Sequence, residues 1–170
     1  MQDIGSMPHT EGSLSLPLAT KISTEMYGRV LIMDDDMFMR SMAVDMLSAL
    51  GFFSRAARNG EEAIAIYRHT QRMGEAFDAV ILDIHIKGGL GGGDTMKHLL
   101  DMDPGLNAIV SSSDETSPLM RAYRDYGFKA RLPKPYSMRQ MFQALITAIN
   151  TSPDVPLQSF PFPSAGGQTK

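Results

Sequence analysis

The sequence predicts an α/β fold in which five βα units build one doubly wound parallel sheet. Short, continuous apolar runs alternate with longer segments whose apolar residues recur at helical spacing, and this alternation is typical of βα units. The run AVIL at residues 79–82 is uniformly apolar, as expected for a strand that helices cover on both faces. Glycine residues follow several of the helical segments, where they can end a helix.

The first two units are expected between residues 29 and 73. Their strands are predicted at residues 29–33 and 53–57, and their helices at about residues 37–50 and 61–73. The first helix places four apolar residues on one face: Met39, Ala43, Met46 and Leu50. The second has the stripe Ala63, Ile64 and Tyr67. Each helix therefore has one side that can cover the sheet.

The last three units are expected between residues 79 and 150. Their strands are predicted at residues 79–82, 108–111 and 129–132. Their helices are predicted at about residues 94–103, 117–126 and 138–150. Ser137 can cap the last helix, whose apolar stripe is Met138, Met141, Leu145 and Ile149.

Composition limits the kind of protein that this chain can be. Its 170 residues, with 43% hydrophobic and 21% charged residues, suit one globular domain, which we place at residues 28–150. Residues 1–27 and 151–170 are expected to be flexible tails. There is no apolar run of membrane-spanning length, so we expect a cytoplasmic protein without membrane contact. Zero cysteines exclude thiolate chemistry, and a net charge of −3 argues against direct DNA binding.

Polar residues gather where the predicted strands end. The run Asp34-Asp35-Asp36 follows the first strand, Asp83 the third, Ser112-Ser113 the fourth and Lys134 the fifth. In an open parallel sheet, ligands bind at the carboxyl ends of the strands, so these side chains are expected to converge. Clustered carboxylates indicate a divalent cation, and Mg²⁺ suits them. A carboxylate beside Mg²⁺, a hydroxyl and an ammonium group suits phosphoryl transfer, with Asp83 as the nucleophile.

Four motifs, in order, resemble the receiver domain of two-component response regulators over residues 28–150. They are RVLIMDDDMFMR, AVILDI, AIVSSSD and RLPKPY. The runs GGLGGG and PLMRAYRDYGF are most similar to receivers attached to hybrid sensor histidine kinases. The resemblance implies a flavodoxin-like (βα)5 fold with the strand order 2-1-3-4-5.

The resemblance also implies a role for each matching residue. On this resemblance, Mg²⁺ is expected to be bound by Asp34, Asp35, Asp83 and the backbone carbonyl of His85. Asp83 is expected to accept the phosphoryl group, Lys134 to pair with a phosphoryl oxygen, and Ser112 to move toward the aspartyl phosphate. The bond between Lys134 and Pro135 is similar to one that is cis in the family. The expected switch and output residues are Ser112, Arg131 and Tyr136.

Partners follow from the same resemblance. The phosphoryl donor is expected to be a sensor histidine kinase or a histidine phosphotransfer protein, and the chain should catalyse only its own phosphorylation and dephosphorylation. The readout surface is expected on the fourth helix, fifth strand and fifth helix, where a downstream protein or a second copy of the chain could bind.

Three features depart from the family pattern. Arg131 stands where the family usually has an aromatic switch residue. Lys87-Gly88 replaces the usual Pro-Gly, and the loop at residues 88–93 contains five glycines, which predicts a loosely specified, mobile conformation. His85 and Asp114 occupy the two positions that tune loss of the phosphoryl group in the family.

Other readings stay open on the sequence alone. Asp36 could simply cap a helix. The chain could be a receiver-like interaction module that signals without phosphorylation. A phosphatase of the haloacid-dehalogenase kind also forms an aspartyl phosphate, although that family has a second Asp where this chain has His85. GGLGGG lacks the Lys-Ser/Thr ending of a nucleotide-binding P-loop.

Overall fold

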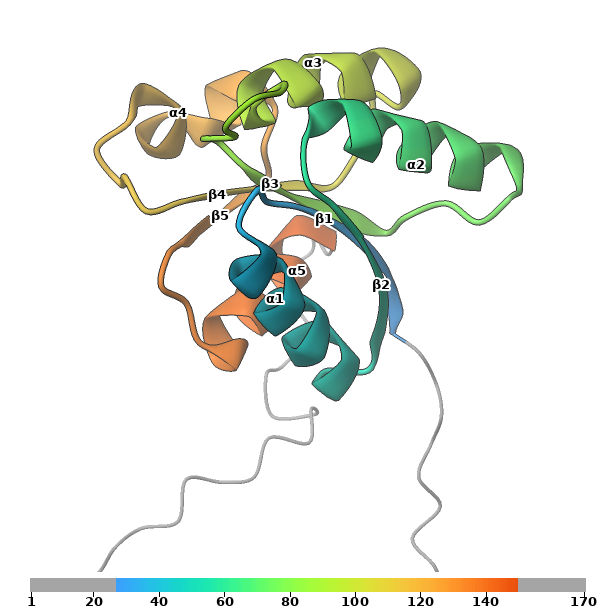
Figure 1. Cartoon of the computed structure of the whole chain (residues 1–170), viewed down its shortest axis with the longest axis horizontal. Coiled ribbons are helices and arrows are strands. Elements are labelled where there is room, and N and C mark those ends of the chain that lie inside the picture. Colours follow the sequence, from blue (N-terminus) through green and yellow to red (C-terminus); the bar gives the residue numbers. More distant parts are fainter. Residues whose placement is uncertain (1–26, 150–170) are drawn as a thin grey trace, which may run out of the picture.

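The computed structural model describes residues 27–149, which form a five-stranded parallel sheet with helices on both faces (Figure 1). The strands are β1 (Gly28–Met33), β2 (Phe52–Ala57), β3 (Ala79–Asp83), β4 (Ala108–Ser112) and β5 (Ala130–Pro133). The helices are α1 (Met37–Ala49), α2 (Gly60–Arg72), α3 (Gly92–Met102), α4 (Pro118–Arg121), the 3-10 helix η1 (Tyr123–Tyr126) and α5 (Met138–Ile149). The strand order β2-β1-β3-β4-β5 confirms the predicted fold class.

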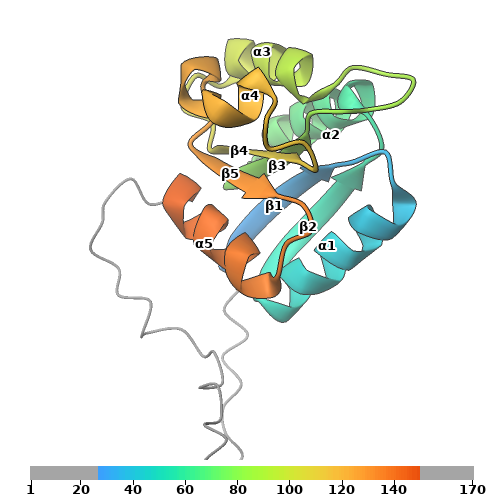
Figure 2. The ribbon, with the colours of Figure 1, turned by 90° about the vertical axis from the view of Figure 1, so that its left-hand side faces the viewer.

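Two hydrophobic cores hold the layers together. Helices α1 and α5 cover one face of the sheet, and α2, α3 and α4 cover the other (Figures 1 and 2). The first core joins Leu47 of α1 and Leu145 of α5 to alternate strand residues such as Ile32. The second joins Tyr67 of α2 and Leu99 of α3 to the strand residues that point the other way. This double burial explains why β3 reads as an uninterrupted apolar run.

The predicted elements agree with the structure to within one or two residues, except for the helix predicted at residues 117–126. On α1 the buried residues are Ala43 and Leu47, so the predicted stripe missed Leu47. On α5 Met141 and Leu145 of the predicted stripe are buried, whereas Met138 is exposed. The capping box of Ser137 and Gln140 begins the helix. The predicted tails and Asn150 lie outside the described residues, except for Tyr27. The ring of Tyr27 packs on Phe52. None of the described helices is long and apolar enough to cross a membrane.

The helix predicted at residues 117–126 is broken. Ser117 caps α4 by accepting a hydrogen bond from the Met120 N–H, but Ala122 leaves helical geometry with φ −112° and ψ 34°. The chain continues as the tighter helix η1 and turns at Gly127, which has φ 87°. Met120 and Phe128 are buried in the same core, with Tyr123 packed against it. The break therefore lies between residues whose side chains share one core, a long-range arrangement that helical periodicity does not reveal.

The glycine-rich loop between β3 and α3 makes specific contacts at Leu90 and Gly92, and its predicted mobility stays a prediction. The backbone N–H of Leu90 donates to the carboxylate of Glu61, and the Leu90 carbonyl accepts the N–H of Gly60 at 3.0 Å. Helix α3 begins inside the loop, at Gly92. A Cβ on Gly92 would lie 2.6 Å from the backbone carbonyl oxygen of Asp83. The glycines therefore allow close packing against the end of β3.

Replacing Gly92 with alanine is expected to lower the free energy of unfolding by about 1–3 kcal/mol, because the new Cβ must displace backbone at Asp83. Gly93→Ala is the matched control. Its Cβ meets only a terminal methyl of Leu119, at 3.0 Å, and alanine favours the helix by about 1 kcal/mol over glycine. Urea unfolding of both variants checks this prediction. Equal midpoints for the two variants would contradict it.

Candidate functional site

The carboxyl ends of four strands meet at one edge of the sheet. Met33, the last residue of β1, pairs with Leu82 of β3, and Asp83 of β3 pairs with Ser111 of β4. The Ile84 N–H donates to the Ser111 carbonyl at 3.0 Å, and the Lys134 N–H donates to the Ser112 carbonyl at 2.8 Å. The residues that follow the strands are therefore brought side by side, as the sequence predicts.

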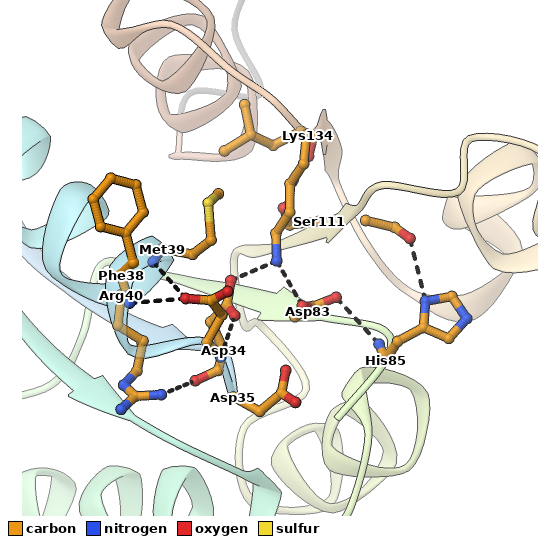
Figure 3. Close-up of polar contacts among 12 residues, drawn as sticks. Asp34, Asp35, Phe38, Met39, Arg40, Asp83, His85, Ser111 and Lys134 are labelled. Atoms are coloured by element: carbon orange, nitrogen blue, oxygen red, sulfur yellow. Dashed lines mark hydrogen bonds and ion pairs between the residues drawn. The ribbon is translucent and has the colours of Figure 1, made fainter. Parts of the chain in front are cut away.

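Three carboxylates converge at this edge (Figure 3). One oxygen each from Asp34, Asp35 and Asp83 lies within 4.8 Å of the others. Asp34 and Asp83 are buried, whereas Asp35 is half-buried. Oxygen donors at this spacing suit a hard divalent cation such as Mg²⁺, and two of the three come from neighbouring central strands. Within residues 27–149, this is the only group of carboxylates and histidines close enough to hold a metal ion.

Lys134 supplies the positive charge of the site. Its Nζ donates to Asp34 Oδ2 at 2.5 Å and to Asp83 Oδ2 at 2.6 Å (Figure 3). Burial alone lowers the pKa of Lys134, but its hydrogen bonds to Asp34 and Asp83 outweigh this effect and raise the pKa above its usual value. Burial also raises the pKa of Asp34, an effect that Lys134 opposes. The ammonium group therefore stays charged and joins the two buried carboxylates.

Backbone contacts fix the acidic side chains in place. Asp34 Oδ1 accepts the Asp36 N–H at 3.0 Å, and Asp35 Oδ2 accepts the Lys87 N–H at 3.2 Å. Asp83 Oδ1 accepts the His85 N–H at 3.1 Å. Because Lys134 holds the other Asp83 oxygen, both oxygens of this carboxylate are oriented. The cluster is thus preorganised by its own chain.

Asp36 has a separate role at the start of α1. Its Oδ1 accepts the N–H groups of Phe38 and Met39 at 2.8 and 3.2 Å, so it is the N-cap that the sequence allowed. Arg40, one turn further on, donates from Nη1 to the backbone carbonyl of Asp34 at 2.7 Å. Sequence reasoning missed Arg40, since nothing in the pattern shows that its side chain turns back toward β1.

The cluster opens into a pocket of about 610 Å³. Its walls include Asp34, Asp35, Asp36, Met39, Asp83, His85, Lys87, Ser113, Lys134 and Pro135. The peptide bond between Lys134 and Pro135 is cis, as predicted. Ser113 was expected at this edge as the second serine after the fourth strand, although no role was assigned to it. Met39 and Lys87 were not among the predicted site residues, because they belong to the first turn of α1 and to a loop, which strand patterns do not place.

The predicted switch residues lie at different depths. Ser112 is fully buried, and its hydroxyl accepts the Asp114 N–H at 3.0 Å and lies 3.4 Å from Nδ1 of His85. Arg131 is exposed on β5. Tyr136 is buried in the core between the sheet and α1 and α5, so it is not part of the exposed surface. Burial raises the pKa of its hydroxyl to about 12.

Comparison with known proteins identifies the family. The family model described as the response regulator receiver domain matches residues 30–146. The chain belongs to this family. Chemotaxis protein CheY of Thermotoga maritima is 30% identical to this receiver over 118 residues, which are 69% of this chain and 93% of that protein. The two-component response regulator ARR22 of Arabidopsis thaliana is also 30% identical over 118 residues, covering 66% of this chain and 78% of the relative.

Two further matches are longer than this receiver. A response regulator receiver protein of Anaeromyxobacter is 32% identical over 110 residues, which are 65% of this chain but only 44% of that protein. Among solved structures, NtrX of Brucella abortus in complex with ATP has a TM-score of 0.66 at 22% identity, covering 74% of this chain and 28% of that one. The CheX–CheY complex of Borrelia burgdorferi with BeF3 and Mg²⁺ has a TM-score of 0.65 at 24% identity, covering 72% and 89%. These structures show the shared fold.

The family accounts for the position of the acidic pocket in this receiver. Receiver domains act in two-component signalling and bind Mg²⁺ at such a pocket, and the donor set of Asp34, Asp35 and Asp83 fits that ion. The match to the receiver family argues against a phosphatase of the haloacid-dehalogenase kind. The roles of the individual side chains, and the relation to hybrid kinases, stay predictions.

Proposed function

We propose that this receiver is a phosphorylation-dependent switch that accepts a phosphoryl group on Asp83 from a phosphohistidine. The donor would be a sensor histidine kinase or a histidine phosphotransfer protein. The observation that carries the proposal is the convergence of Asp34, Asp35 and Asp83 with Lys134, which lies within hydrogen-bond distance of two of these carboxylates. A nucleophilic carboxylate beside a cation site and a fixed ammonium group is what phosphoryl transfer requires.

Each residue of the site would have a separate role in the reaction. A carboxylate oxygen of Asp83 attacks phosphorus, the bond between phosphorus and the donor's imidazole nitrogen breaks, and the imidazole leaves with the electron pair. Asp34, Asp35, Asp83 and the His85 carbonyl would hold Mg²⁺, which when bound neutralises charge on the phosphoryl oxygens. Lys134 already contacts Asp83, so it can donate to the group attached there. Attack by water later returns the free carboxylate and phosphate.

The phosphoryl group would change the protein by adding about 1.5–2 negative charges and strong acceptor oxygens. Ser112 would have to leave its contacts with His85 and Asp114 to reach them, which makes it a two-state element. We propose the surface of α4, β5 and α5, including the exposed Arg131, as the region that a downstream protein or a second copy of the chain reads. The proposed receiver domain is residues 28–150, acting in the cytoplasm and modifying only itself.

The test is intact mass after incubation with acetyl phosphate, with Mg²⁺ or with a chelator. We expect the mass of one phosphoryl group to be added in the presence of Mg²⁺ and no gain in the chelator. Mg²⁺ should also raise the melting temperature, because a ligand that binds only the folded state stabilises it, by about 2.7 kcal/mol at 100 times its Kd. If no condition gives a gain, the phosphorylation-independent interaction module becomes the better description.

A further inference from the structure

Three consecutive serines, Ser111 to Ser113, lie at the end of β4 and directly after it, and the structure gives their hydroxyls three different surroundings. Ser111 is buried and donates to the backbone carbonyl of Leu132 at 2.9 Å, which ties β4 to β5. Ser112 is fully buried beside His85 and accepts the Asp114 N–H. Both hydroxyls therefore have partners within the fold, and neither side chain lines the acidic pocket.

Ser113 differs from both. It is exposed, and it lines the same pocket as Asp83, Lys134 and Pro135. Within residues 27–149, its hydroxyl forms no hydrogen bond. A hydroxyl that faces a site of charged groups without a partner of its own is available to a ligand at that site.

The position of Ser113 directly after β4 places it beside the acceptor. It follows Ser112, whose carbonyl accepts the Lys134 N–H, and Ser111, whose carbonyl accepts the Ile84 N–H. Backbone hydrogen bonds therefore join the end of β4 to the residue after Asp83 on one side and to Lys134 on the other. A group attached to Asp83 and contacted by Lys134 would lie next to the first residue beyond β4.

We propose that the Ser113 hydroxyl donates a hydrogen bond to the phosphoryl group while it is transferred to Asp83. This inference rests on the proposed function and adds a catalytic residue to it. The hydrogen bond would be charge-assisted, because the acceptor is an anionic phosphoryl oxygen, and such bonds are roughly twice as strong as neutral ones. Since Ser113 needs no rearrangement of buried contacts, it can act during transfer, before Ser112 leaves His85.

The test compares rates of phosphorylation by acetyl phosphate with Mg²⁺, followed by intact mass, in three variants. Ser113→Ala is expected to lower the rate about tenfold, which corresponds to about 1.4 kcal/mol. Ser113→Thr keeps the hydroxyl and is expected to restore most of the rate, which a merely structural effect of the substitution would not do. Ser48→Ala, at an exposed serine on α1 far along the chain from the pocket, is the matched control and should react like the wild type.

The outcomes separate this inference from the function on which it rests. Wild-type uptake with a Ser113→Ala rate within twofold of the wild type would overturn the role of Ser113 and leave the proposed function standing. Slow transfer in both Ser113→Ala and Ser113→Thr would also overturn it, because the hydroxyl would then not be the cause. Absence of uptake in the wild type would overturn the proposed function, and this inference with it.

Discussion

Asp83→Asn is expected to abolish the Mg²⁺-dependent gain of a phosphoryl group. The amide has no anionic oxygen to attack phosphorus, and the cation site loses one of its three carboxylates. The shape of the side chain is kept, and its amide oxygen can still accept the His85 N–H. The folded protein should persist, because Lys134 keeps Asp34 as a partner and the substitution removes one of several neighbouring negative charges. Intact mass and thermal unfolding of the same sample measure both effects.

Asp36→Asn is the matched control for that experiment. Asp36 belongs to the same acidic run and lines the same pocket, but its carboxylate caps α1 and is not in the cation cluster. Asparagine is as good an N-cap as aspartate, so stability and phosphoryl uptake should both stay near wild-type values. Uptake by Asp83→Asn at the wild-type rate would place the phosphoryl group on another residue. Loss of uptake in Asp36→Asn as well would show that the whole acidic run is needed.

Sequence reasoning located the site because the acidic residues and Lys134 follow recognisable apolar strands. Once the strands are parallel neighbours, their ends must meet, and Asp34, Asp83 and Lys134 lie together as a consequence. The same logic placed Ser112 at the end of β4, but it could not show that the hydroxyl is buried beside His85. The alternation of side chains gives the face of a strand residue, but the contact of Ser112 with His85 joins two distant segments, and no pattern in AIVSSSD reports it.

The parts that could not be predicted depend on contacts between distant segments. Leu90 of the glycine-rich loop is bonded to Glu61 and Gly60 at the start of α2, some thirty residues earlier in the chain. Composition alone made that loop look loosely specified. The break at Ala122 likewise lies between Met120 and Phe128, which share one core. Periodicity describes one element at a time, so it detects neither the contacts of a loop with a distant segment nor the early end of a helix.

Lys134→Met is expected to separate phosphoryl transfer from cation binding. Loss of the ammonium group removes a fixed donor to the transferred group, which should lower the rate of phosphorylation about 10²–10³-fold. Affinity for Mg²⁺ should be unchanged or higher, because Lys134 Nζ and the cation share the oxygens of Asp34 and Asp83. Without metal, the variant should be less stable than the wild type, since two buried carboxylates lose their shared counter-charge. The rate comes from intact mass, and the affinity from the Mg²⁺ dependence of thermal unfolding.

Lys87→Met is the matched control for Lys134→Met, because it removes a different lysine from the same pocket. Both lysines line the pocket, but Lys87 contacts the cluster through its backbone N–H, which donates to Asp35 and is kept in the variant. A general loss of positive charge would slow both variants alike, whereas a positioned donor would slow only Lys134→Met. Weaker Mg²⁺ binding in Lys134→Met would mean that the ammonium group preorganises the carboxylates more than it competes with the cation. Tighter Mg²⁺ binding together with slow phosphoryl transfer in Lys134→Met would show that Lys134 lowers the affinity for the cation while it supplies a hydrogen bond to the phosphoryl group.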